Sequence, residues 1–149
     1  MVNVGILTCS NSVNESGCSG IGCHDAAHNR TGKLGEHGEE IRIMGMISCA
    51  GCPGKSGFDK ILRRVRSLTS SGAEVLHFGN CMEVYCPFIS KYEQAVKQAF
   101  PELKIVRGVH DSPPEEILNI INNNEDIRGY NRPTSIEVLK AAIAAAAQE

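Results

Sequence analysis

The sequence has no apolar run long enough to span a bilayer, and its first residues carry neither the basic region nor the small-residue cleavage site of an export signal. We therefore expect no membrane association and a cytoplasmic location. A strong charge of one sign is also missing. The formal net charge is −2, which argues against a general nucleic-acid binder. There is no internal repeat, and 149 residues with 42% hydrophobic content are typical of one soluble globular domain.

Two common catalytic motifs are absent as well. Gly54-Lys55-Ser56 follows an apolar run, but the place of the first Gly of a P-loop is taken by Cys49, and Pro53 removes a backbone N–H that would hold phosphate. No Cys is followed by Arg six residues later, which excludes a phosphatase signature of that kind. What the sequence has in excess is cysteine, with seven residues. In a reducing cytosol this number indicates metal or redox chemistry rather than structural disulfides.

Short apolar runs alternate along the chain with stretches of helical periodicity. Between the first two strands, a polar loop over 10–22 and a helix from Cys23 to about Leu34 are expected. Strands are predicted at Val2–Leu7, Ile41–Ile47, Glu74–Phe78 and Leu103–Val109, and two further helices at about 58–71 and 89–100.

Two capping boxes, beginning at Ser112 and Thr134, predict further helices near the C-terminus. Alternation of strands and helices is typical of parallel strands joined by crossovers. We therefore expect an α/β fold, a Rossmann-like or flavodoxin-like three-layer arrangement with a mostly parallel sheet of about four strands and helices on both faces. Residues 1–111 are predicted to form this α/β unit, and 112–149 a helical extension of the same domain.

The cysteines follow the predicted strands. Parallel sheets bind ligands beyond the carboxyl ends of their strands, and Cys9, Cys49, Cys81 and His110 each come just after a different predicted strand. Cys52 and Cys86 follow within a few residues. Because these strand ends meet at one edge of the sheet, at least five thiols and an imidazole are expected to gather there.

Several ordered motifs between Val2 and Asp111 make the sequence similar to the CGGC-domain family. The matching pieces are Ile6-Leu7-Thr8-Cys9, Cys18-Ser19-Gly20-Ile21-Gly22-Cys23, Gly45 to Gly54, Gly72 to His77 leading to Cys81, Cys86-Pro87, and Gly108-Val109-His110. Two positions depart from the family pattern. Ala50 replaces the first central Gly, which changes backbone freedom but removes no ligand, and Ser19 stands where Pro is frequent.

The resemblance implies a small metal-binding protein, with zinc as the usual expectation, and implies no particular reaction. The metal-ligand candidates are Cys9, Cys18, Cys23, Cys49, Cys52, Cys81, Cys86 and His110. An iron–sulfur cluster is the alternative cofactor, because clusters also take four thiolates and their cysteines are sometimes followed by Pro.

A different function remains open for the C-x-x-C pair. In a strand-to-helix turn, Cys49 and Cys52 are typical of a thiol–disulfide redox enzyme, with Cys81 or Cys86 as a resolving thiol. Metal binding is favoured over this alternative, because a thioredoxin-like pair does not explain further cysteines at the same edge.

Overall fold

A computed structural model describes residues 1–14, 18–51, 57–111 and 143–148. The described residues between 2 and 107 form ten regular elements in the order β1 (Val2–Thr8), α1 (Ser10–Asn14), α2 (Ile21–Asn29), α3 (Gly32–Gly35), β2 (Ile41–Ser48), α4 (Asp59–Ser70), β3 (Val75–Phe78), α5 (Asn80–Tyr85), α6 (Ile89–Ala99) and β4 (Lys104–Arg107). Residues 143–146 add one helical turn. Most of the C-terminal extension predicted from the sequence lies outside the described residues.

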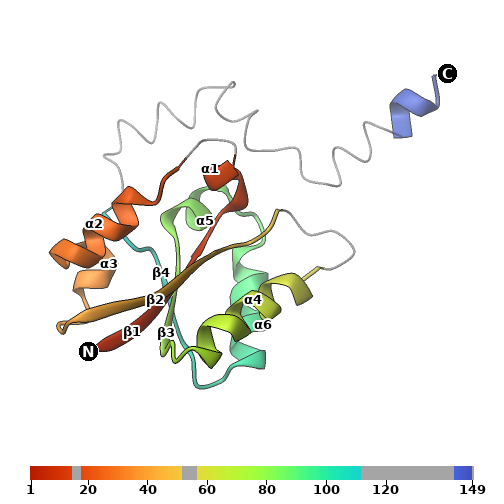
Figure 1. Cartoon of the computed structure of the whole chain (residues 1–149). Coiled ribbons are helices and arrows are strands. Elements are labelled where there is room, and N and C mark those ends of the chain that lie inside the picture. Colours follow the sequence, from red (N-terminus) through yellow and green to blue (C-terminus); the bar gives the residue numbers. More distant parts are fainter. Residues whose placement is uncertain (15–17, 52–56, 112–142, 149) are drawn as a thin grey trace.

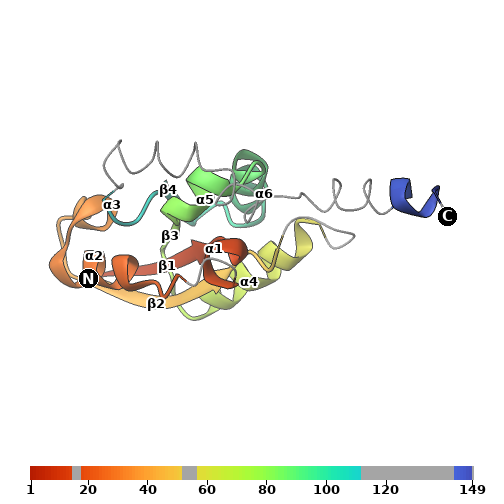
Figure 2. The ribbon, with the colours of Figure 1, turned by 90° about the horizontal axis from the view of Figure 1, so that it is seen from above.

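The described strands form one parallel sheet with the order β2-β1-β3-β4. The α2 and α3 helices lie on one side of this sheet, and α4 and α6 lie on the other (Figures 1 and 2). The predicted α/β fold with helices on both faces is therefore confirmed. Within the described residues, no helix combines the length and the apolar character needed to cross a membrane.

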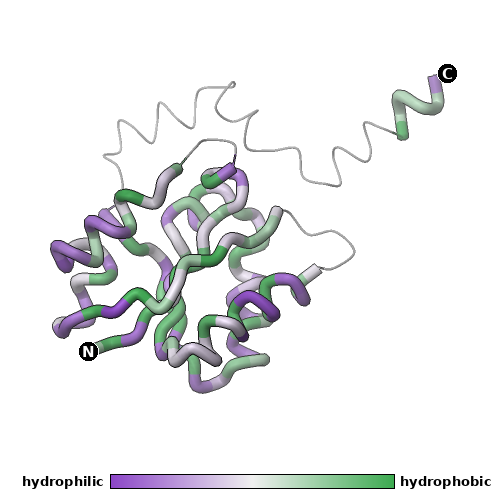
Figure 3. The backbone as a smooth tube through the Cα atoms, in the orientation of Figure 1, coloured by the Kyte–Doolittle hydropathy of each residue, from purple (hydrophilic) through white to green (hydrophobic). Residues whose placement is uncertain are grey.

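Each face of the sheet has its own core, because successive strand residues point to opposite faces. On one face Val4 and Ile6 of β1 pack with residues of α2 and α3, including Ala26 and Leu34. On the other face Leu7 packs with a larger cluster from α4 and α6, whose buried residues are Ile61, Val65, Leu68, Ile89, Tyr92 and Val96. Figure 3 shows the alternation of hydrophobic and hydrophilic residues along α4 that this packing requires.

Two predictions about the first crossover are wrong. The expected loop over 10–22 begins with the short helix α1, and the expected helix from Cys23 to Leu34 is two helices, α2 and α3. The break falls at Arg30, whose φ of 52° is left-handed and ends α2. This break lets α3 approach the chain that follows β4, where the Leu34 N–H donates to the Val109 carbonyl at 3.3 Å.

Candidate functional site: thiols at the carboxyl ends of the strands

The sulfur atoms of Cys49 and Cys81 both accept hydrogen bonds from the backbone just after β1. The N–H of Ser10 donates to Cys49 Sγ at 3.3 Å, and the N–H of Cys9 donates to Cys81 Sγ at 3.1 Å. The Cys49 N–H in turn donates to the Thr8 carbonyl at 3.0 Å, which extends the β1–β2 ladder by one residue. Three of the predicted cysteines therefore meet at one edge of the sheet.

The strand order explains why they meet. From β1 the chain crosses to β2 on one side, whereas β3 and β4 lie on the other side of β1. This reversal is the topological switch point at which open α/β sheets bind their ligands. Cys9 follows the central strand β1, with Cys49 after one neighbouring strand and Cys81 after the other.

Cys9 and Cys49 form a buried pair in which the thiol of Cys9 is hydrogen-bonded to the Cys49 sulfur. This hydrogen bond is the main cause that lowers the pKa of Cys49. The backbone N–H groups of Ser10 and Gly51 and the positive charge of Lys60 add to it against the effect of burial. The same hydrogen bond and burial raise the pKa of Cys9. The backbone N–H groups of Ser12 and Asn11 oppose the increase at Cys9, and the net effect makes a negative charge more favourable on Cys49 than on Cys9.

Lys60 holds the turn that follows β2. Its ammonium group donates to the carbonyl of Gly51 at 2.6 Å and to that of Ala50 at 3.4 Å. Both Ala50 and Gly51 have left-handed backbones, with φ of 61° and 91°. The substitution of the family's Gly by Ala at position 50 thus falls where an L-residue is strained.

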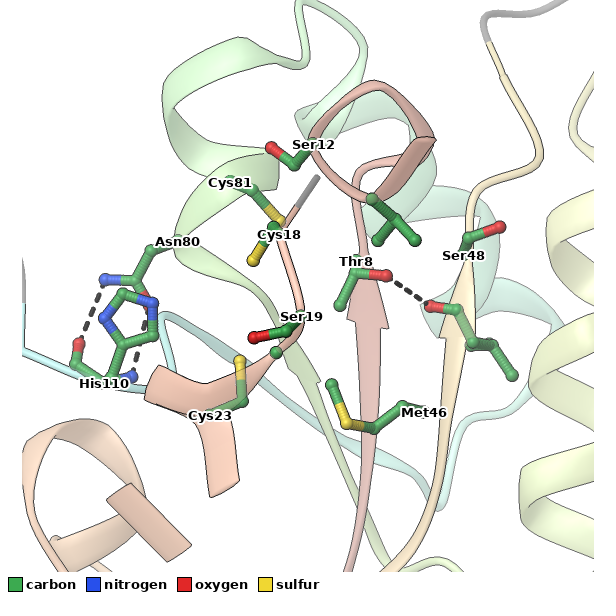
Figure 4. Close-up of a pocket in the computed structure, with 13 residues that line it drawn as sticks. Thr8, Ser12, Cys18, Ser19, Cys23, Met46, Ser48, Asn80, Cys81 and His110 are labelled. Carbon is green, nitrogen blue, oxygen red and sulfur yellow. Dashed lines mark hydrogen bonds between the residues drawn. The ribbon is translucent and has the colours of Figure 1, made fainter. Parts of the chain in front are cut away.

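A cavity of about 320 Å³ opens beside Cys81, and Figure 4 shows the residues that line it. It lies between the carboxyl ends of β1 and β2, helices α1 and α5, and the segment that leads into α2. Its lining residues are Thr8, Ser12, Val13, Cys18, Ser19, Gly20, Cys23, Met46, Ile47, Ser48, Asn80, Cys81 and His110. Three thiols and one imidazole therefore share one cavity.

Two of the three thiols in the cavity have raised pKa values. Burial raises the pKa of Cys23 to about 11, and the charges of Cys81 and Cys18 contribute to the increase. Burial also raises the pKa of Cys81, again with a contribution from Cys18. In Figure 4 the Cys23 sulfur points toward the space occupied by Cys18 and Cys81. Since a positive charge favours thiolates, a cation in this cavity would oppose the raised pKa values of Cys23 and Cys81.

Asn80 fixes the chain that carries His110. Its Oδ1 accepts the N–H groups of Val109 and His110 at 2.8 and 3.2 Å, and its Nδ2 donates to the His110 carbonyl at 3.0 Å. The His110 ring Nδ1 lies 2.8 Å from the carbonyl oxygen of Asp111. Because a carbonyl only accepts, Nδ1 carries a hydrogen, and in the neutral ring Nε2 has the free lone pair. A neutral imidazole oriented in this way is suited to bind a metal.

The structure divides the predicted site residues into separate groups. Cys18, Cys23, Cys81 and His110 line the cavity, Cys9 and Cys49 form the buried pair, and Cys86 packs against the apolar cluster around α4 and α6. Cys52 lies outside the described residues. Within the described part of the chain, no three His, Cys, Asp or Glu side chains are already close enough together to hold a metal ion.

Sequence reasoning missed Asn80 and Lys60, because an amide just after a strand and a lysine in a predicted helix carry no distinguishing pattern. The structure also brings His37 and His77 together. Their Nε2 atoms lie 2.8 Å apart, and Nδ1 of the buried His77 lies 2.7 Å from the Gly108 carbonyl oxygen. The two histidines are 40 residues apart in the sequence, so only the tertiary fold brings them together.

Comparisons with known proteins agree with the family resemblance that the sequence motifs indicate. The CGGC domain matches residues 3–110. The chain is 31% identical over 118 residues to "Uncharacterized protein MJ0582" of Methanocaldococcus jannaschii, covering 73% of this chain and 87% of that protein. It is 33% identical over 69 residues to "Uncharacterized protein MJ0766" of the same organism, covering 45% of this chain and 98% of that protein. No solved structure matches significantly. The family match covers most of the chain, from the first strand to the imidazole of the cavity, and the chain belongs to the CGGC domain family.

Proposed function

We propose that this protein binds a zinc ion in the cavity at the strand ends, through the thiolates of Cys18, Cys23 and Cys81 and the imidazole of His110. The observation that carries the proposal is that these four groups line a single cavity. Membership of the CGGC family adds support, because the family resemblance implies metal binding.

The chemistry of the donors fits zinc. Zinc favours four ligands, and three sulfurs with one imidazole nitrogen form one of its usual sets. The mutual repulsion of the three thiolates is relieved by a divalent cation, and binding would release the thiol protons. Closing the site requires side-chain rotation, since no three described donors already converge on one point. A bound zinc ion would supply folding free energy and a Lewis-acidic centre.

An iron–sulfur cluster is less well matched, because clusters usually take four thiolates. The described lining of the cavity has three thiols. The identity of the metal is tested by purifying the untagged protein anaerobically without added metal. We expect a colourless sample with close to one zinc per chain. A brown sample with comparable amounts of iron and acid-labile sulfide would show that the protein binds an iron–sulfur cluster instead of zinc.

The ligand set is tested with Cys18→Ser, Cys23→Ser and Cys81→Ser. Each variant should lose most of the zinc in elemental analysis, because serine is a poor ligand for this metal. Cys86→Ser is the matched control, since Cys86 packs against the apolar cluster and does not line the cavity. It should keep its zinc. If Cys23→Ser and Cys81→Ser both retain wild-type zinc, the proposed site is wrong.

Thiol–disulfide chemistry at Cys49 is a second candidate function, and it is supported by the lowered pKa of this thiol. The sequence makes Cys52 its partner, as in other C-x-x-C pairs. Mass mapping of the oxidised protein under non-reducing conditions tests this pairing. A reversible Cys49–Cys52 disulfide would support it, and Cys52 remaining alkylatable after full oxidation of Cys49 would exclude it.

A further inference from the structure

We propose that Cys9 and Cys49 form a second reactive site, in which thiols from two adjacent strands reduce a small hydroperoxide and are joined in a Cys9–Cys49 disulfide. This site is distinct from the zinc site proposed above, and it gives Cys49 a partner other than Cys52.

The positions of the two residues already suit a disulfide. Thr8 and Ser48 are directly paired across β1 and β2, and Cys9 and Cys49 are the next residues on each chain. Neighbouring strands lie about 4.8 Å apart. This distance falls within the range of roughly 4.4–6.8 Å that separates the Cα atoms of disulfide-bonded cysteines. The N–H of Ser10, the residue after Cys9, donates to Cys49 Sγ at 3.3 Å, so the Cys49 side chain points toward the end of β1. Forming the bond therefore needs little backbone movement.

The surroundings of the pair assign a role to each thiol. Backbone N–H groups surround both sulfurs: those of Ser10 and Gly51 lie at Cys49, and those of Asn11 and Ser12 lie at Cys9. The positive charge of Lys60, whose ammonium group is held by the Gly51 carbonyl, adds to them at Cys49. A nearby positive charge favours the thiolate, which is the nucleophilic form. Cys49 is thus the attacking group and Cys9 the resolving thiol.

Burial limits the size of the substrate. The exposed fractions are 5% for Cys9 and 6% for Cys49. In thiol–disulfide exchange the attacking sulfur must lie in line with both sulfurs of the substrate, and each of those sulfurs carries a carbon chain that needs space. A hydroperoxide presents a bare oxygen at one end, so it needs much less room. The proposed substrate class is therefore hydrogen peroxide or a small organic hydroperoxide.

The reaction balances in two steps. The Cys49 thiolate attacks the terminal oxygen of the peroxide, an S–O bond forms, the O–O bond breaks, and the leaving oxygen takes a proton to give water or an alcohol. Cys49 is then a sulfenic acid. The sulfur of Cys9 attacks the Cys49 sulfur, its thiol proton leaves with the hydroxyl as water, and the disulfide forms. The peroxide gains two electrons and the pair loses two; a dithiol reductant restores the thiols.

The test uses the full-length protein, treated with hydrogen peroxide and mapped by mass spectrometry after alkylation of free thiols. Wild-type protein should form a Cys9–Cys49 disulfide, consume one peroxide per disulfide, and return to free thiols with dithiothreitol. Cys9→Ser should instead accumulate a sulfenic acid at Cys49, which dimedone traps. Cys52→Ser and Cys86→Ser are the controls, and both should still form the Cys9–Cys49 disulfide.

Two results would overturn the proposal. The first is wild-type protein in which peroxide joins Cys49 to Cys52 or another thiol while Cys9 remains free, a result that does not depend on how any variant folds. The second is faster modification of Cys49 by oxidised glutathione than by an equal concentration of hydrogen peroxide, which would contradict the proposed substrate class.

Discussion

The Asn80 side chain connects the stability of the fold to the position of His110, and its removal has a calculable cost. Asn80→Ala deletes three hydrogen bonds to the chain after β4, one of them from the fully buried Val109 N–H. An unpaired buried N–H costs roughly 1–3 kcal/mol, and each of the two half-buried bonds contributes about 0.5–1.5 kcal/mol. Water can reach some of the groups that lose their partner, so the total loss is smaller than the largest sum. The free energy of unfolding should fall by about 2–4 kcal/mol.

Urea denaturation measures this loss, and competition with a zinc chelator measures the consequence for His110. Because Asn80→Ala leaves every proposed ligand in place, weaker zinc binding would report the freed backbone of His110. Asn80→Asp is the matched variant. It keeps both accepted bonds and loses only the donated one, and it places a carboxylate opposite the His110 carbonyl, so its loss of stability should be intermediate. A cost below about 0.5 kcal/mol for Asn80→Ala would refute this account of the hydrogen bonds.

Three further predictions concern stability. A Cβ on Gly5 would lie 2.6 Å from Leu68 Cδ1, so Gly5→Ala should cost about 1–3 kcal/mol in urea denaturation, and the double variant with Leu68→Ala should cost less than the two changes added together. Ala50→Gly relieves the left-handed backbone at an exposed turn and should raise the melting temperature, with a gain of roughly 0.5–1 kcal/mol. Burial lowers the pKa of His77 below its ordinary value of 6.5. The folded state therefore holds it neutral, and its contribution to stability is present above about pH 6.5 and lost as the pH falls. Unfolding of wild type and His77→Phe between pH 5 and 8 should show a smaller pH dependence for the variant, and equal slopes would contradict the assignment.

The two central strands, β1 and β3, were predictable from the sequence because they are mostly buried. Val2 to Leu7 and Val75 to Phe78 are short apolar runs bounded by turn residues, and this pattern allows few alternatives. The short helices α1 and α5 were not predicted. They have five and six residues, which is too short for helical periodicity to be visible, and α5 follows β3 without a linker. Yet these helices carry Ser12 and Cys81 to the cavity.

The cysteine placement could be predicted only as far as the edge of the sheet. That thiols follow strands can be read from the sequence, but which strands are neighbours cannot, since several orders suit the same alternation of elements. The observed order puts β1 between β2 and β3, so Cys9 faces Cys49 on one side and contacts Cys81 through its backbone on the other. An order with β2 at the far edge beyond β4 would have separated the same residues.

Strand order therefore decides which thiols lie close together. Cys9 and Cys49 follow a directly paired position on adjacent strands, and both are buried. Cys81 follows β3 on the opposite side of β1, where the segment entering α2 supplies Cys18 and Cys23 and leaves a cavity large enough for an ion and its ligands. A short separation with little space favours a covalent bond between sulfurs, whereas a wider separation around a cavity favours a shared cation. The two proposals thus assign the same residue type different chemistries at one edge of the sheet.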